Sequence, residues 1–235
     1  MAQPTTTTTV KAVREVAPGV REIVLAAPAE PLSFRAGQWL SLHLPVGEHP
    51  PLVRAYSLAA PPSPDGELTL CLDRVPDGLG SGYLFSVSPG DEIRFAGVLG
   101  NFVLPEAPGE LLWLARYTGI VPFRAMLLEL RQSPPPRKVT LIYSAARPED
   151  LAYHAELLRT AEECEWFELI AAVDEPDAGW AGRVGPVLEL LPAWLGDRAD
   201  LTPMICGKRE FVRPLRDFFY ERGFGRRDVK WENYD

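Results

Sequence analysis

The chain has 235 residues, of which 46% are hydrophobic and 24% charged, a composition typical of folded globular proteins. Its formal net charge of -8 argues against general nucleic-acid binding, because neutralising phosphates requires a basic surface. The chain contains no apolar run of membrane-span length, and its Thr-rich start lacks a signal core, so we expect a cytoplasmic protein without membrane association.

Short extended runs separated by Pro- and Gly-containing turns fill the first hundred residues. We interpret the threonine run 5–9 as a frayed terminus. Six strands with this length and spacing predict a small closed antiparallel β-barrel. The expected strands cover residues 10–16, 20–26, 39–44, 55–59, 67–72 and 92–95.

Near residues 105–109 the pattern changes to alternating apolar strands and helices. This alternation predicts an α/β domain with a doubly wound parallel sheet, which binds ligands at the carboxyl ends of its strands. We therefore expect two domains, a β-barrel at 1–106 and the α/β domain at 107–235. The expected strands are 111–115, 139–143, 167–173 and 203–206, and the expected helices are 127–131, 149–164 and 209–222.

The first chemical motif is Arg54-Ala55-Tyr56-Ser57, in a predicted barrel strand. Arg54 and Tyr56 lie on one face of the strand, because side chains alternate with a period of two. A guanidinium can bind phosphate oxygens and a phenol can stack on a flat ring, so the pair suits a ligand that has both. The alternative is a surface Arg beside a core Tyr.

A second motif, Gly78-Leu79-Gly80-Ser81, follows the strand that contains Leu72. Small residues before a helix start allow close backbone approach to an anion, although an ordinary loop has the same composition. An Arg-x-Tyr-Ser strand followed by Gly-x-x-Ser resembles the flavin-binding domain of the ferredoxin–NADP reductase superfamily. The segments 37–40, which begins with Gly-Gln, and 97–102, which has two glycines and a Phe, are similar to that family as well.

The resemblance implies specific flavin contacts. Arg54 and Ser81, with Gly80 beside them, would hold the flavin phosphates, and Tyr56 would stack on the isoalloxazine ring. Ser57 would hydrogen-bond near the ring nitrogen that accepts hydride, and the backbone at Leu72 would line the cofactor. The same motif pair favours FAD over FMN.

The segment Thr118-Gly119-Ile120-Val121-Pro122 joins a strand to a helix, where an α/β sheet binds a nucleotide pyrophosphate. It resembles the family's Gly-Gly-Thr-Gly-Ile-x-Pro segment, with Thr118, Gly119 and Pro122 matching. Arg116 and Tyr117 stand where two glycines are usual. Their side chains would either obstruct the pyrophosphate or, in the case of Arg116, bind it.

Four later residues extend the nucleotide prediction. Arg147 resembles an Arg that meets the nucleotide, and Cys206-Gly207 resembles the Cys-Gly pair beside the nicotinamide; a buried structural cysteine is the alternative. Asp174 would accept hydrogen bonds from the free hydroxyls of the adenosine ribose and would repel a 2′-phosphate. The alternative is that Asp174 is a solvated acid in a loop. NADH is therefore slightly favoured over NADPH.

The aromatic and acidic end of the chain completes the predicted site. In the family, a C-terminal Glu and an aromatic residue approach the flavin, so Glu232 would orient Cys206 or relay protons and Tyr234 would cover the ring. Packing of the aromatic side chains against the barrel is the alternative. The cysteines and histidines lack metal-site spacing, so no metal is expected.

The resemblance implies an FAD-dependent NAD(P)H oxidoreductase. Its substrate would be a nicotinamide nucleotide, and its acceptor a ferredoxin-like or other redox protein. Two alternatives remain open. One is an NAD(P)H-dependent reductase of free flavin, and the other is an electron-transfer subunit whose nucleotide binding is impaired at Arg116 and Tyr117.

Overall fold

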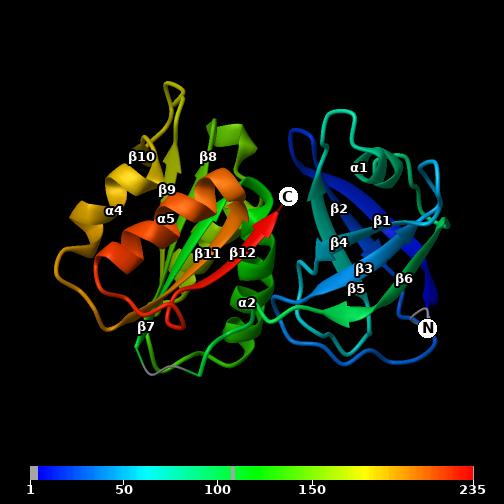
Figure 1. Cartoon of the computed structure of the whole chain (residues 1–235), viewed down its shortest axis with the longest axis horizontal. Coiled ribbons are helices and arrows are strands. Elements are labelled where there is room, and N and C mark those ends of the chain that lie inside the picture. Colours follow the sequence, from blue (N-terminus) through cyan, green and yellow to red (C-terminus); the bar gives the residue numbers. More distant parts are fainter. Residues whose placement is uncertain (1–4, 107–108, 235) are drawn as a thin grey trace. The chain divides into compact units, whose positions relative to one another are not determined.

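A computed structural model of the chain describes residues 5–106 and 109–234 (Figure 1). The described residues form two compact units. The first contains the chain up to Leu104 together with helix α2 (Val121–Gln132). The second contains the remainder, from 105–120 and from 133 onward. The chain first passes from one unit to the other between residues 104 and 105, near the expected boundary at 106/107. The grouping of α2 with the first unit was not anticipated.

The first unit is built on a six-stranded sheet in the order β4-β3-β6-β1-β2-β5. All of its pairings are antiparallel, and an isolated bridge between Leu58 and Leu70 joins the two ends of the sheet, as the predicted barrel requires. The strands are β1 (Thr6–Ala17), β2 (Val20–Leu25), β3 (Trp39–Leu44), β4 (Leu52–Ser57), β5 (Leu68–Asp73) and β6 (Glu92–Leu99), with helix α1 (Leu79–Leu84) between the last two.

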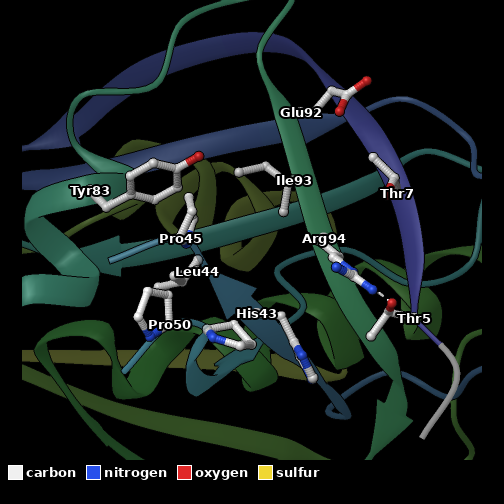
Figure 2. Close-up of a pocket in the computed structure, with 11 residues that line it drawn as sticks. Thr5, Thr7, His43, Leu44, Pro45, Pro50, Tyr83, Glu92, Ile93 and Arg94 are labelled. Carbon is white, nitrogen blue, oxygen red and sulfur yellow. Dashed lines mark hydrogen bonds between the residues drawn. The ribbon is translucent and has the colours of Figure 1, made fainter. Parts of the chain in front are cut away.

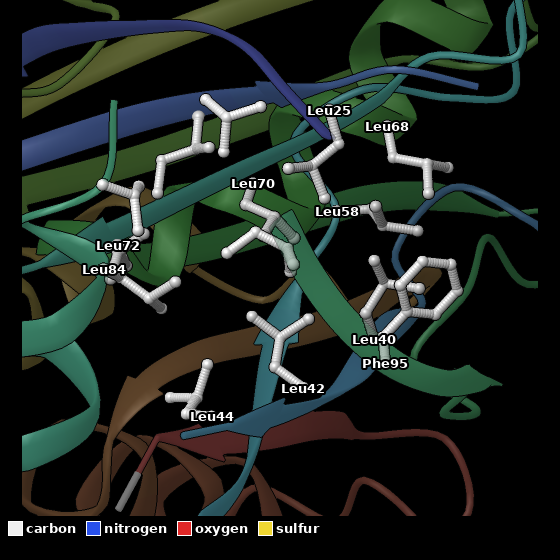
Figure 3. Packing of buried hydrophobic residues seen from close by; sticks show 14 residues of the cluster. Leu25, Leu40, Leu42, Leu44, Leu58, Leu68, Leu70, Leu72, Leu84 and Phe95 are labelled. Carbon is white, nitrogen blue, oxygen red and sulfur yellow. The ribbon is translucent and has the colours of Figure 1, made fainter. Parts of the chain in front are cut away.

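Leucine side chains fill the interior of this barrel (Figure 3). Leu25, Leu40, Leu42 and Leu70 are fully buried, and Phe95 packs beside them. Residues at alternate positions of a strand point to the same face, so Leu40, Leu42 and Leu44 form the face of β3 that packs inside the barrel. This apolar interior fixes the strand register on which the predicted ligand residues of β4 depend.

The interpretation of the threonine run as frayed was wrong. Residues 6–9 pair with β6, with Thr6 opposite Phe95 and Thr9 opposite Glu92. Threonine is β-branched and favours strands, and Thr8 is buried with its hydroxyl donating to the carbonyl of Ala26 at 2.6 Å. The ladder and this bond outweigh the tendency of a polar terminus to fray.

The second unit contains a parallel six-stranded sheet in the order β10-β9-β8-β7-β11-β12, which confirms the predicted doubly wound α/β fold. Helices α4 and α5 bury apolar side chains against β7, β8 and β11. The strands are β7 (Glu110–Arg116), β8 (Val139–Ala145), β9 (Phe167–Val173), β10 (Arg183–Val184), β11 (Leu201–Lys208) and β12 (Lys230–Tyr234). The helices are α3 (His154–Glu163), α4 (Val187–Leu195) and α5 (Arg209–Glu221), with short 3-10 turns η1 (Tyr117–Ile120) and η2 (Pro148–Asp150).

The largest differences from the sequence predictions lie in this unit. The single helix expected at 149–164 is interrupted, because Tyr153 has a left-handed φ of 61° between η2 and α3. Helix α4 and strand β12 were not anticipated. Strand β12 has only five residues, and the first two are exposed. Its sequence therefore has no clear alternation of apolar and polar residues from which a strand could be predicted, although it pairs with β11 in the structure.

The helices of the described part of the chain are all too short or too polar to cross a membrane.

Candidate flavin and nucleotide sites

Arg54 and Tyr56 lie on β4 opposite Leu42 and Leu40 of β3. Helix α1 meets them at Gly80. A Cβ atom on that glycine would lie 3.0 Å from the Tyr56 hydroxyl and 3.5 Å from Arg54 Cγ. The structure therefore brings the two predicted flavin motifs together, and the missing side chain of Gly80 permits that approach.

The environment of Tyr56 is suited to a neutral ring that stacks on a ligand. Burial raises the pKa of its phenol to about 12, although the nearby Arg54 guanidinium lowers it and Asp73 raises it. Arg54 is exposed and donates one bond, from Nη1 to the carbonyl of Val53 at 2.8 Å. An exposed guanidinium beside a half-buried aromatic ring matches the needs of a phosphate-bearing flavin, so these residues fit the group.

Ser81, Ser57 and Leu72 are all buried. The Ser81 hydroxyl accepts a hydrogen bond from the backbone N–H of Val75 at 3.1 Å and lies within bonding distance of the carbonyl of Gly78. Its side chain therefore closes the loop that leads into α1. That geometry holds the loop in shape beside Arg54 and Tyr56.

An ionic cluster around the buried Glu22 of β2 was missed by sequence reasoning. Glu22 accepts hydrogen bonds from Arg14 at 2.6 and 3.0 Å, and Arg124 of α2 lies 3.8 Å from its second oxygen. Arg124 also donates to the carbonyl of Ala59, two residues beyond β4, at 2.7 Å. The only available signal was an arginine within the apolar start of α2, whose neighbours Phe123 and Met126 are fully buried.

A pocket of about 500 Å³ lies elsewhere on the first unit (Figure 2). His43, Tyr83 and Arg94 line it, and Arg94 Nε donates to the Thr5 hydroxyl at 2.6 Å. Among the described residues that line it, none was predicted to bind flavin. The pocket is therefore not the site formed by Arg54 and Tyr56.

The order of the parallel sheet changes direction between β7 and β11, and ligands bind at such a switch point. Gly119, in the turn after β7, lies directly against the end of β11. A Cβ on Gly119 would be 2.2 Å from the carbonyl oxygen of Cys206 and 3.0 Å from Gly207 Cα. Thr118 is buried in the same turn, and Pro122 is the second residue of α2, as predicted.

Strand β12 brings three of the predicted catalytic residues, Cys206, Glu232 and Tyr234, onto neighbouring strands. Cys206 pairs with Glu232, and Lys208 pairs with Tyr234. Burial raises the pKa of the Cys206 thiol well above its usual value and Glu232 raises it further, whereas a hydrogen bond with Tyr234 opposes the shift. The thiol is therefore protonated at neutral pH, so it can donate a hydrogen bond but is a poor nucleophile.

Two ion pairs cross the carboxyl ends of β7, β8 and β9. Arg116 Nη2 lies 2.6 Å from Asp174 Oδ2, and Arg147 Nε lies 3.0 Å from Glu175 Oε2. The exposed Arg147 has its pKa raised by the hydrogen bond and charge of Glu175. Arg147 and Asp174, the two charged residues predicted to contact the nucleotide, therefore each have an opposite charge beside them.

Both units of the chain are similar to oxidoreductase domains of known families. Residues 7–104 match the model described as the oxidoreductase FAD-binding domain, and residues 115–217 match the oxidoreductase NAD-binding domain. A ferredoxin–NADP reductase B from Sorangium cellulosum (strain So ce56) is 33% identical over 235 residues, which cover 95% of both chains. The chain belongs to the ferredoxin–NADP reductase family.

Other members of the family differ in length. The toluate 1,2-dioxygenase electron transfer component of Pseudomonas putida is 28% identical over 212 residues, and the match spans 90% of this chain but 62% of that protein. A ferredoxin–NADP+ reductase from Neisseria gonorrhoeae, solved with FAD and NADP, has the same fold with a TM-score of 0.84. It is 24% identical, and the match covers 99% of each chain.

The resemblance inferred from the two motifs is thereby confirmed. The chain is a flavin-dependent NAD(P)H oxidoreductase with an FAD-binding and an NAD-binding domain.

Proposed function

We propose that this ferredoxin–NADP reductase family member takes hydride from NADH, in preference to NADPH, and passes the electrons to a small redox protein such as a ferredoxin. FAD bound to the first unit would supply the capacity to accept a hydride and release single electrons. The observation that carries the proposal is the clustering of Cys206, Glu232 and Tyr234 at the switch point of the nucleotide sheet.

Five residues of the first unit are proposed to hold the flavin. Arg54 supplies positive charge for the phosphates, and Gly80 with Ser81 keeps the loop close to them. Tyr56 stacks on the ring, and Ser57 donates a hydrogen bond at its edge. Support comes from the proximity of Gly80 to the Tyr56 hydroxyl, and from the backbone at the buried Leu72, which belongs to the neighbouring strand β5.

The nucleotide is proposed to bind along the carboxyl edge of the second sheet. Thr118 and Gly119 lie at the switch point, where a pyrophosphate can approach the backbone, and Pro122 lies in the first turn of the following helix α2. Arg147 is proposed to contact a phosphate. Asp174 is proposed to accept hydrogen bonds from the adenosine ribose, which favours NADH.

The residues of β11 and β12 are proposed to act at the nicotinamide. The protonated Cys206 thiol, next to Gly207, would orient the ring, because a buried neutral donor keeps its direction. Glu232 would hold a proton near the thiol, and Tyr234 would shield the reacting face until the nicotinamide arrives. Excluding water in this way favours hydride transfer over side reactions.

The electron acceptor is proposed from the relatives. The Sorangium relative is named as a ferredoxin–NADP reductase and the Pseudomonas relative as an electron transfer component. The first name includes a ferredoxin, and the second describes electron transfer. A ferredoxin-like partner is therefore the first acceptor to test.

Anaerobic rapid mixing of the purified protein with NADH or NADPH tests the proposal. We expect flavin absorbance to bleach in a single-turnover phase that is faster with NADH at equal concentration. Absence of bleaching with both nucleotides would eliminate the proposed reaction and favour the alternative of an impaired electron-transfer subunit.

The colour of the purified protein tests how flavin is held. We expect a yellow protein that retains FAD through gel filtration. A colourless protein that oxidises NADH only when flavin is added in multiple-turnover amounts would instead identify a reductase of free flavin.

A further inference from the structure

Arg116 occupies a position at which it can control the adenosine end of the nucleotide site. It is the last residue of β7, where it pairs with Ser144 of β8, which in turn pairs with Ala172 of β9. Its guanidinium nevertheless reaches Asp174, beyond the end of β9, at 2.6 Å. The side chain therefore extends over the carboxyl end of the intervening strand β8.

Both partners of this ion pair are held in place. The Asp174 backbone N–H lies 3.1 Å from the carbonyl of Ala146. On the other side, the Arg116 guanidinium lies 4.9 Å from the centre of the Tyr117 ring. Tyr117 has a left-handed φ of 50°, and its carbonyl accepts a hydrogen bond from the buried Tyr143 hydroxyl at 3.2 Å. The hydrogen bond from Tyr143 of β8 therefore holds the backbone next to Arg116 in place.

We propose that Arg116 and Asp174 form one specificity element, in which Arg116 is a latent ligand for a ribose 2′-phosphate and Asp174 is its internal competitor. The inference rests on the proposed nucleotide site and deepens it. A carboxylate by itself repels a 2′-phosphate, but an arginine binds either a carboxylate or a phosphate with charge-assisted hydrogen bonds. Loss of the acid therefore leaves Arg116 available for the phosphate.

The exposure of the pair makes this exchange feasible. The Arg116 side chain is 24% exposed and the Asp174 side chain 39% exposed, so an incoming phosphate can reach the guanidinium from solvent. Ion pairs that are partly exposed contribute little to folding, so separating this one has a small energetic cost. With Arg116 present, the unsubstituted protein should therefore discriminate against NADPH less strongly than a protein that has Asp174 but lacks Arg116.

The experiment compares two small probes that differ only at the 2′ position. Isothermal titration calorimetry of the purified flavoprotein measures the affinity for 5′-AMP and for adenosine 2′,5′-bisphosphate. The variants are Asp174→Asn, Arg116→Gln and the double variant. Asp174→Asn should raise the affinity for the bisphosphate about tenfold relative to 5′-AMP, the amount expected for gaining a hydrogen bond between charged groups.

The double variant identifies the cation responsible. With Arg116→Gln added to Asp174→Asn, the bisphosphate gain should disappear, and in the single variant the gain should shrink as salt is raised. A gain that survives in the double variant, or no gain in Asp174→Asn, would overturn the proposal.

Glu175→Gln is a matched control, because it releases Arg147 from the neighbouring ion pair on the same edge. We expect it to change the ratio of the two affinities by less than about twofold, because both probes carry the 5′-phosphate that Arg147 could contact and only the 2′-phosphate differs between them. A tenfold gain in this variant would instead assign the 2′-phosphate to Arg147 and contradict the role of Arg116.

Rapid mixing separates failure of this inference from failure of the proposed function. If the unsubstituted protein bleaches with NADH but Asp174→Asn shows no faster reaction with NADPH, the specificity element alone is wrong. If neither nucleotide bleaches any of the proteins, the proposed function is wrong, and bisphosphate binding by calorimetry still decides whether Arg116 binds phosphate.

Discussion

Gly119 and Cys206 are in such close contact that a methyl group on the glycine would overlap the backbone of the cysteine, 2.2 Å from its carbonyl oxygen. The two residues are 87 positions apart in the sequence; Gly119 lies in the turn η1 that follows β7, and Cys206 lies near the end of the neighbouring strand β11. Their contact sets the spacing of the switch point at which the nicotinamide is proposed to bind.

Replacing Gly119 by Ala should therefore destabilise the protein and disturb the site. Because backbone atoms have to move, we expect a loss of about 1–3 kcal/mol in the free energy of unfolding, as in other overpacked positions. Urea denaturation measures this loss, and rapid mixing should show slower flavin bleaching. Gly179→Ala is the control, since its Cβ would lie 3.6 Å from Asp177 Oδ1, an ordinary contact. Equal stability of the two variants would contradict the packing argument.

Replacing Glu22 by Gln should destabilise the first unit. The carboxylate is buried and faces both Arg14 and Arg124, so its loss leaves buried positive charge with less compensation. Removal of one partner from a buried ionic pair costs about 3–5 kcal/mol, which urea denaturation would detect. Asp217→Asn, which removes an exposed partner of Arg213 on α5, should change stability by less than about 1 kcal/mol. A comparable effect of the two substitutions would show that the Glu22 cluster is not stabilising.

Replacing Tyr56 by Ala should weaken flavin binding by roughly 1–3 kcal/mol, by analogy with bases that stack on aromatic side chains. Tyr56→Phe should retain most of the affinity, because stacking requires the ring and not the hydroxyl. Fluorescence titration of the apoprotein with FAD measures both. If Tyr56→Ala binds FAD as tightly as the unsubstituted protein, the ring does not stack on the flavin.

The thiol of Cys206 should be chemically inert in the folded protein. Burial and Glu232 raise its pKa, so the thiolate that reacts with iodoacetamide is scarce below pH 9, and the partly exposed Cys164 should be alkylated first. Mass spectrometry after timed alkylation at pH 8 measures the order. Preferential modification of Cys206 would show that the thiol is accessible and ionised.

The same shift has a defined sign for stability. The folded-state pKa of the Cys206 thiol lies above the unfolded value of about 9. The contribution of this thiol to the free energy of unfolding is therefore complete below pH 9 and is lost as the pH rises through the folded-state pKa. In Cys206→Ala, the free energy of unfolding should decrease less at alkaline pH than in the unsubstituted protein. The variant should also slow hydride transfer without weakening FAD binding, if the thiol orients the nicotinamide.

Local patterns were sufficient to predict both sheets. Strand 39–44 and strand 167–173 have the predicted bounds, because apolar runs bounded by turns define buried strands. Arg54 and Tyr56 could be assigned to one strand because a period of two is a local property. The neighbouring Gly80 could be linked to them only through resemblance, and the structure then placed it against the Tyr56 hydroxyl.

The sequence by itself determined the class of most elements, the order of an antiparallel sheet followed by a parallel one, and the motifs that identify the family, since these depend on residues close together in the chain. Only the tertiary structure decided that Arg124 lies near Glu22 and Arg116 against Asp174, whereas the meeting of Glu232 with Cys206 had been expected from the family resemblance alone. The physical reason is that such pairs depend on strand order and register, which are selected by burial across the whole sheet and leave no periodic signal in either partner's local sequence.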